Sequence, residues 1–316
     1  MKTIHDAAAF LRQHDNYLIM THRRPDGDAV GSAAALCLGL RALGKSAEVF
    51  PNPQFTGRFA PLLEGLLGTG DPTGRTVIAV DLADEKLLPY NAPGMAGKIA
   101  FSMDHHPSNT GYAPHSLVAG DAAACGEIVL DVLTELKVTL TEPMATALYI
   151  AISTDTGCFR FTNVTAATYR AAARCKDAGA ETELWNRLLF STKSRGRLSV
   201  ETYLYKNADF YMDGKVAVCL LPQAVAVQNG ATEDDLDNIS DYPREIAGVE
   251  IAIVLREVKD GAKISIRTFD PWDASFLCSL LGGGGHKNAA GATVPGTLQD
   301  GKAAILDAMR RAGYPL

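Results

Sequence analysis

Hydrophobic and polar positions in the first half of the chain alternate between two kinds of segment. Short apolar runs predict buried strands, which occupy residues 17–20, 47–50, 76–80 and 98–103. Longer stretches with apolar and small residues at helical spacing predict helices over residues 28–43, 121–136, 142–153 and 166–178. This alternation predicts an α/β fold in which a mostly parallel sheet carries helices on both faces.

The pattern changes in the second half of the chain. Residues 181–209 have a helical pattern rich in Arg and Lys, and we interpret residues 186–209 as a helical linker. Longer strands are predicted at residues 215–221, 249–258 and 262–268, and a final helix near residues 298–312. A length of 316 residues also favours two domains. We therefore expect domains over residues 1–185 and 210–316, the second a smaller α/β domain with a mixed sheet.

Composition and charge narrow the classes of protein. With 47% hydrophobic and 21% charged residues, the chain is typical of a globular protein. A formal net charge of −6 argues against a stable complex with long nucleic acid, which usually requires a basic surface. Six cysteines without a C-x-x-C pair are typical of a reducing compartment. No apolar run approaches the length of about 20 residues that spans a membrane, so we expect a cytoplasmic protein without a membrane partner.

Acidic residues and histidines recur directly after the predicted apolar segments of the first domain. They are His22, Asp26, Asp28, Asp81, Asp104, His105, His106 and Asp155. Because the carboxyl ends of parallel strands share one edge of a sheet, we expect these side chains to lie close together. Taken singly, each has a simpler interpretation: a capping Asp, a structural His, or a turn at "DTG". Their common placement is what argues for one site.

Such a cluster of carboxylates requires a positive charge, because the groups otherwise repel one another and their pKa values rise. Carboxylates mixed with imidazoles suit Mn²⁺ or Mg²⁺, and the histidines favour Mn²⁺. The number of ligands fits two ions that share a bridging carboxylate, about 3.5–4 Å apart, an arrangement used for attack of hydroxide on phosphorus.

A glycine-rich segment marks the second domain. In "LLGGGGHKNAAG", Gly283, Gly284 and Gly285 precede His286. Glycines let the backbone approach a ligand closely, and we expect a following helix N-terminus to add positive potential. His286 can donate to a phosphate oxygen or stack on a base. The simpler interpretation is a tight turn between a helix and a strand. Arg267, on the predicted strand "KISIRTF", is placed to reach the same cleft.

These motifs together resemble those of a known superfamily. The segments "HRRPDGDAVGS", "DLAD", "DHHPSN" and "STDTGCFRF" resemble the four motifs of the DHH phosphoesterase superfamily, and "GGGGHKNAAGA" resembles the motif of its type-1 associated C-terminal domain. In length and layout the chain is similar to the bacterial group that combines oligoribonuclease (nano-RNase) and pAp phosphatase activity. RecJ-like exonucleases share the motifs but carry further nucleic-acid-binding domains.

The resemblance implies a site with two Mn²⁺ ions, with Mg²⁺ as the alternative metal. One ion would be held by His22, Asp26 and Asp81. The other would be held by Asp28, Asp81, His105 and Asp155, so that Asp81 bridges the two. His106 would face the substrate phosphate, and Asp104 would orient a histidine. Arg267 would contact substrate phosphate or base, beside the glycines and His286.

The implied activity is that of an Mn-dependent phosphoesterase. It would hydrolyse short oligoribonucleotides or dinucleotides to mononucleotides and convert pAp to AMP by attack of metal-activated hydroxide. Three alternatives stay open: hydrolysis of linear dinucleotides such as pGpG or pApA, a manganese-dependent inorganic pyrophosphatase, and a nucleotide sensor without turnover. The GGGGH segment argues against the pyrophosphatase, and the complete ligand set argues against the sensor. The resemblance also suggests a homodimer.

Overall fold

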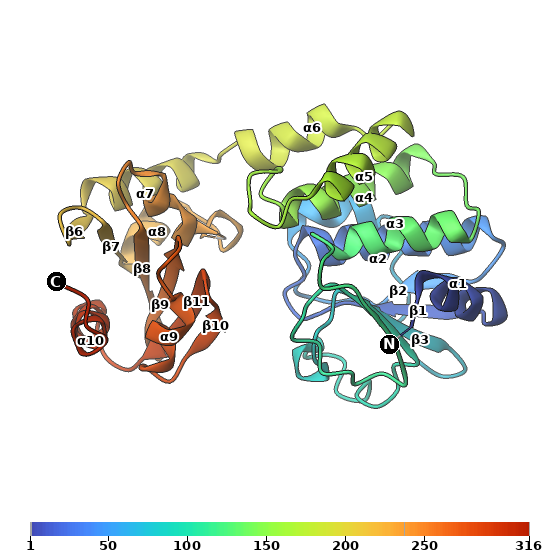
Figure 1. Ribbon diagram of the computed structural model, residues 1–316, viewed down its shortest axis with the longest axis horizontal. Helices are drawn as coiled ribbons and strands as arrows, with labels where there is room; N and C mark the ends of the chain where they lie inside the picture. The colour runs from blue at the N-terminus through green and yellow to red at the C-terminus, as the bar shows by residue number, and fades with distance from the viewer. Residues whose placement is uncertain (1, 237, 316) are drawn as a thin grey trace. The chain divides into compact units, whose positions relative to one another are not determined.

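A computed structural model describes residues 2–236 and 238–315 of the chain (Figure 1). The chain divides into two compact units, and the boundary between them along the sequence falls between Thr192 and Lys193. The segment predicted as a linker, residues 186–209, is shared between the two units. Its first part is a π-helical turn, Arg187–Ser191, in the first unit, and its second part is helix α7 (Arg195–Lys206), in the second.

The first unit consists of a parallel sheet and the helices packed on it. Its strands are β1 (Tyr17–Met20), β2 (Ala47–Val49), β3 (Thr76–Val80), β4 (Phe101–Asp104) and β5 (His115–Val118). Its α-helices are α1 (Ile4–Gln13), α2 (Gly27–Ala42), α3 (Cys125–Glu135), α4 (Glu142–Asp155), α5 (Ala166–Asp177) and α6 (Thr182–Asn186). Two 3₁₀ helices, Gly57–Leu63 and Glu85–Leu87, lie in the connections after β2 and β3.

The strand order of this sheet creates one preferred position for a site. The order is β2-β1-β3-β4-β5, and every neighbouring pair is parallel. The chain thus moves outward from β1 to β2 in one direction and from β3 to β5 in the other. In sheets of this kind ligands bind outside the carboxyl ends of the strands, at the point between β1 and β3 where the direction reverses.

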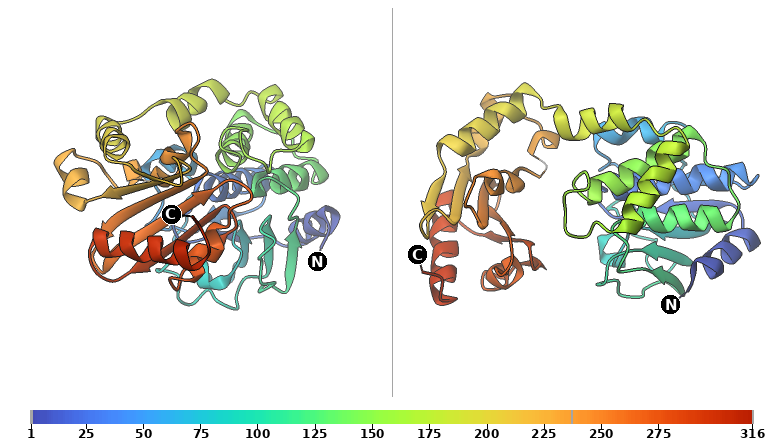
Figure 2. Two further views of the ribbon diagram at one scale, coloured as in Figure 1. Left: turned by 60° about the vertical axis from the view of Figure 1, so that its left-hand side comes forward. Right: turned by 45° about the horizontal axis from the view of Figure 1, so that its top comes forward.

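The two faces of the sheet are covered differently (Figure 2). The face with Tyr17 and Ile19 packs against helices, including α1, α2 and α3. The face with Leu18 and Met20 packs against residues 82–99, whose only regular element among the described residues is the 3₁₀ helix Glu85–Leu87. The fold class is therefore as predicted, except that no α-helix covers this second face. Two prolines and two glycines between residues 89 and 97 prevent one from forming.

The second unit contains a mixed sheet of six strands in the order β10-β11-β9-β8-β7-β6. Its strands are β6 (Asp209–Tyr211), β7 (Val216–Leu221), β8 (Ile251–Val258), β9 (Gly261–Thr268), β10 (Gly284–His286) and β11 (Ala289–Val294). Besides α7, its helices are α8 (Gln223–Gln228), α9 (Ala274–Ser279) and α10 (Leu298–Arg311), with 3₁₀ helices Asp234–Leu236 and Ile239–Glu245. The parallel pair β7–β8 makes the sheet mixed, as predicted.

The second sheet is covered completely on one face only. Helices α9 and α10 pack against the face that carries Ile253 and Ile266. On the opposite face, α7, α8 and the 3₁₀ helix Ile239–Glu245 pack over β7 and β8, around Cys219 and Val254. Nowhere in residues 2–236 and 238–315 is a helix both long enough and apolar enough to cross a lipid bilayer.

Candidate active site

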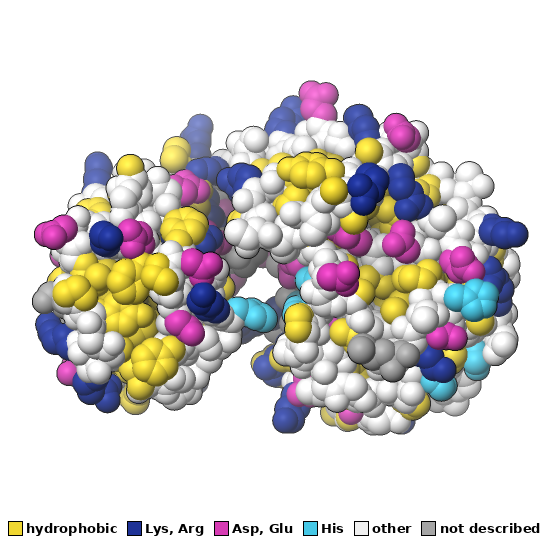
Figure 3. Space-filling model, in the orientation of Figure 1, with side chains coloured by type: hydrophobic (Ala, Val, Ile, Leu, Met, Phe, Trp, Pro, Cys, Tyr) yellow, Lys and Arg dark blue, Asp and Glu magenta, His cyan; other side chains and the backbone are white. Residues whose placement is uncertain are grey.

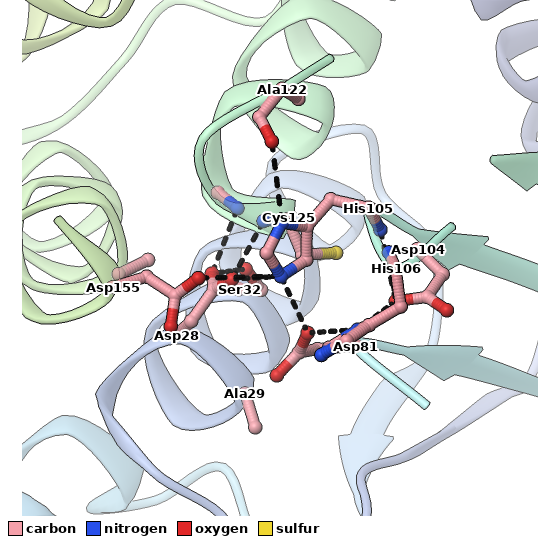
Figure 4. Close-up of polar contacts among 12 residues, drawn as sticks. Asp28, Ala29, Ser32, Asp81, Asp104, His105, His106, Ala122, Cys125 and Asp155 are labelled. Carbon is pink, nitrogen blue, oxygen red and sulfur yellow. Dashed lines mark hydrogen bonds and ion pairs between the residues drawn. The ribbon is translucent and has the colours of Figure 1, made fainter. Parts of the chain in front are cut away.

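The predicted acidic and histidine residues of the first unit converge at the carboxyl end of its parallel sheet. His22 and Asp26 follow β1, Asp28 lies in the first turn of α2, and Asp81 follows β3. Asp104, His105 and His106 lie at the end of β4. Asp155 reaches the same place from the C-terminus of helix α4, as Figure 4 shows. The sheet edge expected from the sequence therefore carries the cluster, but one of its members comes from a helix.

Three groups of potential ligand atoms form within this cluster. The groups are His22–Asp26–Asp81, Asp28–His105–Asp155 and Asp81–His105–His106, and in each the ligand atoms lie within 4.8 Å of one another. The His105 Nε2 atom is 3.3 Å from Asp155 Oδ2, 3.5 Å from Asp81 Oδ1 and 3.7 Å from Asp28 Oδ2. His22 Nε2 is 3.6 Å from the other Asp81 oxygen, Oδ2. Asp81 thus lies between the two histidines.

Asp81 is unusual in both backbone and side chain. Its φ of 53° lies in the left-handed region, which non-glycine residues other than Asn and Asp rarely adopt. Its side chain is buried, and Oδ1 has no hydrogen-bond partner among the described residues. Strained backbone and unpaired buried polar atoms concentrate at functional sites. A cation at this point would satisfy the orphaned oxygen.

The backbone orients both flanking histidines toward the carboxylates. His22 Nδ1 donates to the carbonyl of Arg23 at 2.8 Å, and His105 Nδ1 donates to the carbonyl of Ala122 at 3.3 Å. Each donation fixes the proton on Nδ1 and leaves Nε2 directed into the cluster. Metal-binding histidines typically have this second hydrogen bond.

Asp104 holds His106 rather than facing the cluster centre. The buried Asp104 carboxylate accepts from His106 Nδ1 at 2.8 Å, from the backbone N–H of His105 at 2.9 Å, and from Asn109 Nδ2 at 2.7 Å. This contact agrees with the expectation that Asp104 orients a histidine. Asn109, the last residue of the segment "DHHPSN", is a site residue that the sequence did not predict, although an amide beside a buried carboxylate is a natural donor.

Asp28 joins the cluster to helix α3. Its buried carboxylate accepts from the backbone N–H groups of Cys125 (2.6 Å) and Gly126 (2.9 Å), the first residues of α3, and from Ser32 Oγ (3.0 Å). Helix α3 has no capping side chain of its own, so Asp28 satisfies its free donors from a distant part of the sequence. Sequence spacing indicates Ser32, four residues after Asp28, but gives no signal for the contact with α3.

The electrostatics of the cluster call for positive charge. Burial and neighbouring carboxylates raise the pKa of Asp28 well above its usual value and that of Asp155 to about 8. Burial opposes protonation of His22, but its ion pair with Asp81 and the nearby Asp26 carboxylate outweigh it and raise the pKa of His22 to about 9. Without a bound cation, protons would compensate the clustered negative charge. Divalent cations could replace those protons, and the oxygen and imidazole donors fit them.

In the second unit, Arg267 and His286 lie at one level of the sheet. Ala289 of β11 pairs with Arg267 of β9 on one side and with His286 of β10 on the other. Residues at equal register on neighbouring strands share a face, so both side chains lie on the face that α9 and α10 leave open. Arg267 Nε donates to Asp241 at 3.0 Å, and His286 is exposed.

The glycine segment forms a hairpin instead of a loop before a helix. The residues after His286 belong to strand β11, so the expected helix N-terminus is absent from this stretch of the described chain. A Cβ at Gly283 would lie 2.2 Å from the Gly291 carbonyl, and one at Gly285 would lie 2.6 Å from the Ala289 carbonyl. Close strand packing thus requires these two glycines. Gly284, by contrast, borders open space.

Comparisons with known proteins agree with this geometry. The model for "DHH family, N-terminal domain" matches residues 16–152, and that for the "DHHA1 domain" matches residues 213–312. The bifunctional oligoribonuclease and PAP phosphatase NrnA of Thermus thermophilus is 34% identical over 305 residues, which cover 94% of this chain and 91% of that protein. The chain therefore belongs to the DHH family and is a hydrolase of phosphoester bonds.

Two solved structures share the fold. An exopolyphosphatase-related protein from Bacteroides fragilis superposes with a TM-score of 0.88 at 21% identity, covering 98% of this chain and 95% of that one. Exonuclease RecJ bound to manganese superposes with a TM-score of 0.54 at 16% identity, covering 98% and 95% of the two chains. At these identities the structures establish the fold alone.

Proposed function

We propose that the protein hydrolyses short oligoribonucleotides and dinucleotides to mononucleotides and removes a phosphate from pAp to give AMP. The observation that carries this proposal is the cluster of carboxylates and histidines around the orphaned Asp81 oxygen. The activities named for the Thermus thermophilus relative supply the substrate class. On the face drawn in Figure 3, Lys and Arg side chains are interspersed with acidic ones, which fits small substrates better than long nucleic acid.

Two divalent cations would be bound by two overlapping ligand sets. His22, Asp26 and Asp81 would hold one, and Asp28, Asp81, His105 and Asp155 the other. When bound, such cations activate water and neutralise charge on the phosphoryl oxygens. We take Mn²⁺ as the metal because three histidines lie in the cluster and because the related fold of RecJ has been solved with manganese.

The protein's own groups would position the phosphate. Because Asp104 engages Nδ1 of His106, the Nε2 atom of that ring is left to face a substrate. The hydrogen bond to Asp104 raises the pKa of His106 to about 9, although burial opposes it, and so favours the protonated ring. Protonated His106 would donate a hydrogen bond to a phosphoryl oxygen and stabilise the charge that develops there.

The second unit would bind the remainder of the nucleotide. Arg267 and His286 share the face of its sheet opposite α9 and α10, with the small residue Ala289 between them. A guanidinium and an imidazole arranged in this way can contact a phosphate or stack on a base. Gly284, which like Gly282 has open space at its Cβ position, is a point where a ligand could approach the backbone.

Substitution of Asp81 tests the proposal directly. Asp81→Asn keeps the shape of the side chain and a residue type that tolerates a φ of 53°, but removes the negative charge. Hydrolysis of a 5′-phosphorylated diribonucleotide with Mn²⁺ is expected to fall by at least about 100-fold. The matched control is Asp131→Asn, an exposed carboxylate on α3, with unchanged activity expected. Full activity of the Asp81→Asn variant would contradict the proposed ligand set.

A further inference from the structure

A separate pocket adjoins the candidate active site within the first unit. It has a volume of about 250 Å³ and is lined by Arg23 and by residues between Glu85 and Ala96. Arg23 connects the pocket to the cluster through its backbone. The Arg23 carbonyl accepts from His22 Nδ1 at 2.8 Å, and the Arg23 N–H donates to the Leu87 carbonyl at 2.6 Å. One wall of the pocket is therefore fixed to a candidate metal ligand.

The pocket combines an aromatic ring with an available cation. The Tyr90 side chain is 67% exposed, and the Arg23 guanidinium lies 5.5 Å from the centre of its ring. Among the described residues, the guanidinium has no carboxylate partner. Lys86 is exposed at the rim, while Glu85, the acidic residue of the lining, accepts from the N–H of Gly97 at 2.6 Å. Two cations, Arg23 and Lys86, against the single carboxylate of Glu85 give the lining a formal net charge of +1.

The remaining lining is apolar and rigid. It includes Leu88, Pro89 and Pro93, two of which have a fixed backbone φ. Apolar side chains beside an exposed aromatic ring and a guanidinium suit a planar, electron-rich group. Every nucleobase has such a face, and stacking on aromatic side chains and arginine is how proteins bind unpaired bases.

We propose that this pocket binds one nucleobase of a short substrate, stacked on Tyr90 and flanked by Arg23. The inference rests on the proposed function, because it assigns a subsite to a dinucleotide whose phosphate meets the cluster beside His22. The volume also limits the occupant. At about 250 Å³ it falls below the range of about 300–1,000 Å³ typical of larger ligands, so it accommodates a single base and not a strand.

A cycle of protein and substrate changes tests the pocket. The proteins are the wild type, Tyr90→Ala, Tyr90→Phe and, as a matched control, Phe210→Ala, an exposed aromatic residue on β6 of the second unit. The ligands are a diribonucleotide and its two abasic versions, each lacking one base. KM is measured for the hydrolysable forms. Kd is measured by calorimetry for forms with a non-hydrolysable methylphosphonate linkage.

The expected signature is coupling between Tyr90 and one base only. Tyr90→Ala should weaken binding of the complete dinucleotide by about 5- to 150-fold, the range for loss of one stacked base. Its binding of one abasic ligand should equal that of the wild type. Tyr90→Phe and Phe210→Ala should both bind like the wild type, because the first keeps the ring and the second lies elsewhere.

Two failures can be told apart. If turnover by the wild type persists but Tyr90→Ala weakens all three ligands equally, or none of them, the pocket proposal is wrong and the proposed function stands. If the wild type turns over none of the hydrolysable ligands, the proposed function fails. The calorimetric measurements then still test the pocket proposal. Equal affinities of the wild type and Tyr90→Ala for every analogue would overturn that proposal.

Discussion

At the scale of single residues, the site is explained by where each polar atom finds its partner. Asp104 accepts hydrogen bonds from the backbone, His106 and Asn109, whereas Asp81 Oδ1 has no hydrogen-bond partner among the described residues. Two carboxylates of similar burial thus have different tasks. The sequence predicted both as members of one cluster, but it gave no means to see that Asn109 completes the environment of Asp104.

Asp104 provides a prediction at this scale. In Asp104→Asn the carboxylate charge that raises the pKa of His106 is lost. An NH2 group also replaces one of the two oxygens that accept from His106 and Asn109, so the hold on the His106 ring is weakened. The kcat on a dinucleotide is expected to fall about 10- to 100-fold, the range for loss of a group that orients a functional histidine. Calorimetric titration should show Mn²⁺ affinity within a few-fold of wild type. Loss of Mn²⁺ binding would instead make Asp104 part of the cation site.

At the scale of elements, the packing of α2 against α4 positions two candidate ligands. Asp28 lies in the first turn of α2, and Asp155 ends α4. A Cβ at Gly31 would lie 2.3 Å from the Ala147 carbonyl and 3.0 Å from Ala151, so these helices are in close contact. The small residues after "HRRPDGD" indicated a helix, but only the tertiary structure shows that Gly31 sets the separation between the two ligands.

Gly31→Ala tests this packing. The added methyl would force α2 and α4 apart, which is expected to destabilise the protein by about 1–3 kcal/mol. It should also lower activity, because Asp28 and Asp155 move relative to each other. Denaturant unfolding and dinucleotide hydrolysis check both effects. Gly94→Ala is the matched control: its nearest neighbour is Lys98 Nζ at 3.8 Å, so no change is expected. Wild-type behaviour of Gly31→Ala would show that the helices tolerate separation.

Other elements show why the sequence pattern did not predict every helix end and strand. Helix α4 continues two residues beyond its predicted end and so carries Asp155 into the cluster, which strand-end reasoning cannot foresee. Strand β5 and the hairpin β10–β11 were missed because they are short, and their pairing depends on distant strands. In the GGGGH segment, glycines that looked suited to a ligand are largely required by the hairpin itself.

At the scale of the whole molecule, the negative charge of the clustered carboxylates affects the stability of the folded state. The clustered carboxylates of the first unit are folded together at an electrostatic cost that bound cations would remove. The alternation of strands and helices predicted the α/β class and the two-part layout from sequence alone. The sequence did not show that Arg267 and His286 share a face of the second unit's sheet, because only β-pairing on either side of Ala289 brings them to one level.

Metal binding should therefore stabilise the folded protein. At a Mn²⁺ concentration about 100 times Kd, linkage gives about 2.7 kcal/mol, which corresponds to a rise in Tm of about 5–10 °C for a unit of this size. Differential scanning calorimetry of metal-stripped protein with and without Mn²⁺ measures it. Asp81→Asn is the control, with a much smaller shift expected. An equal shift in that variant would place the stabilising ions elsewhere.

The most direct test of the central claim is turnover by metal-stripped protein reloaded with Mn²⁺ on four substrates side by side: pAp, a 5′-phosphorylated diribonucleotide, a 24-residue RNA and pyrophosphate. Release of phosphate and mononucleotides is measured for each. Fast turnover of the diribonucleotide and pAp, with little on the longer RNA or pyrophosphate, is the predicted result. Fast turnover of only the longer RNA or pyrophosphate, or of none of the four, would contradict the account.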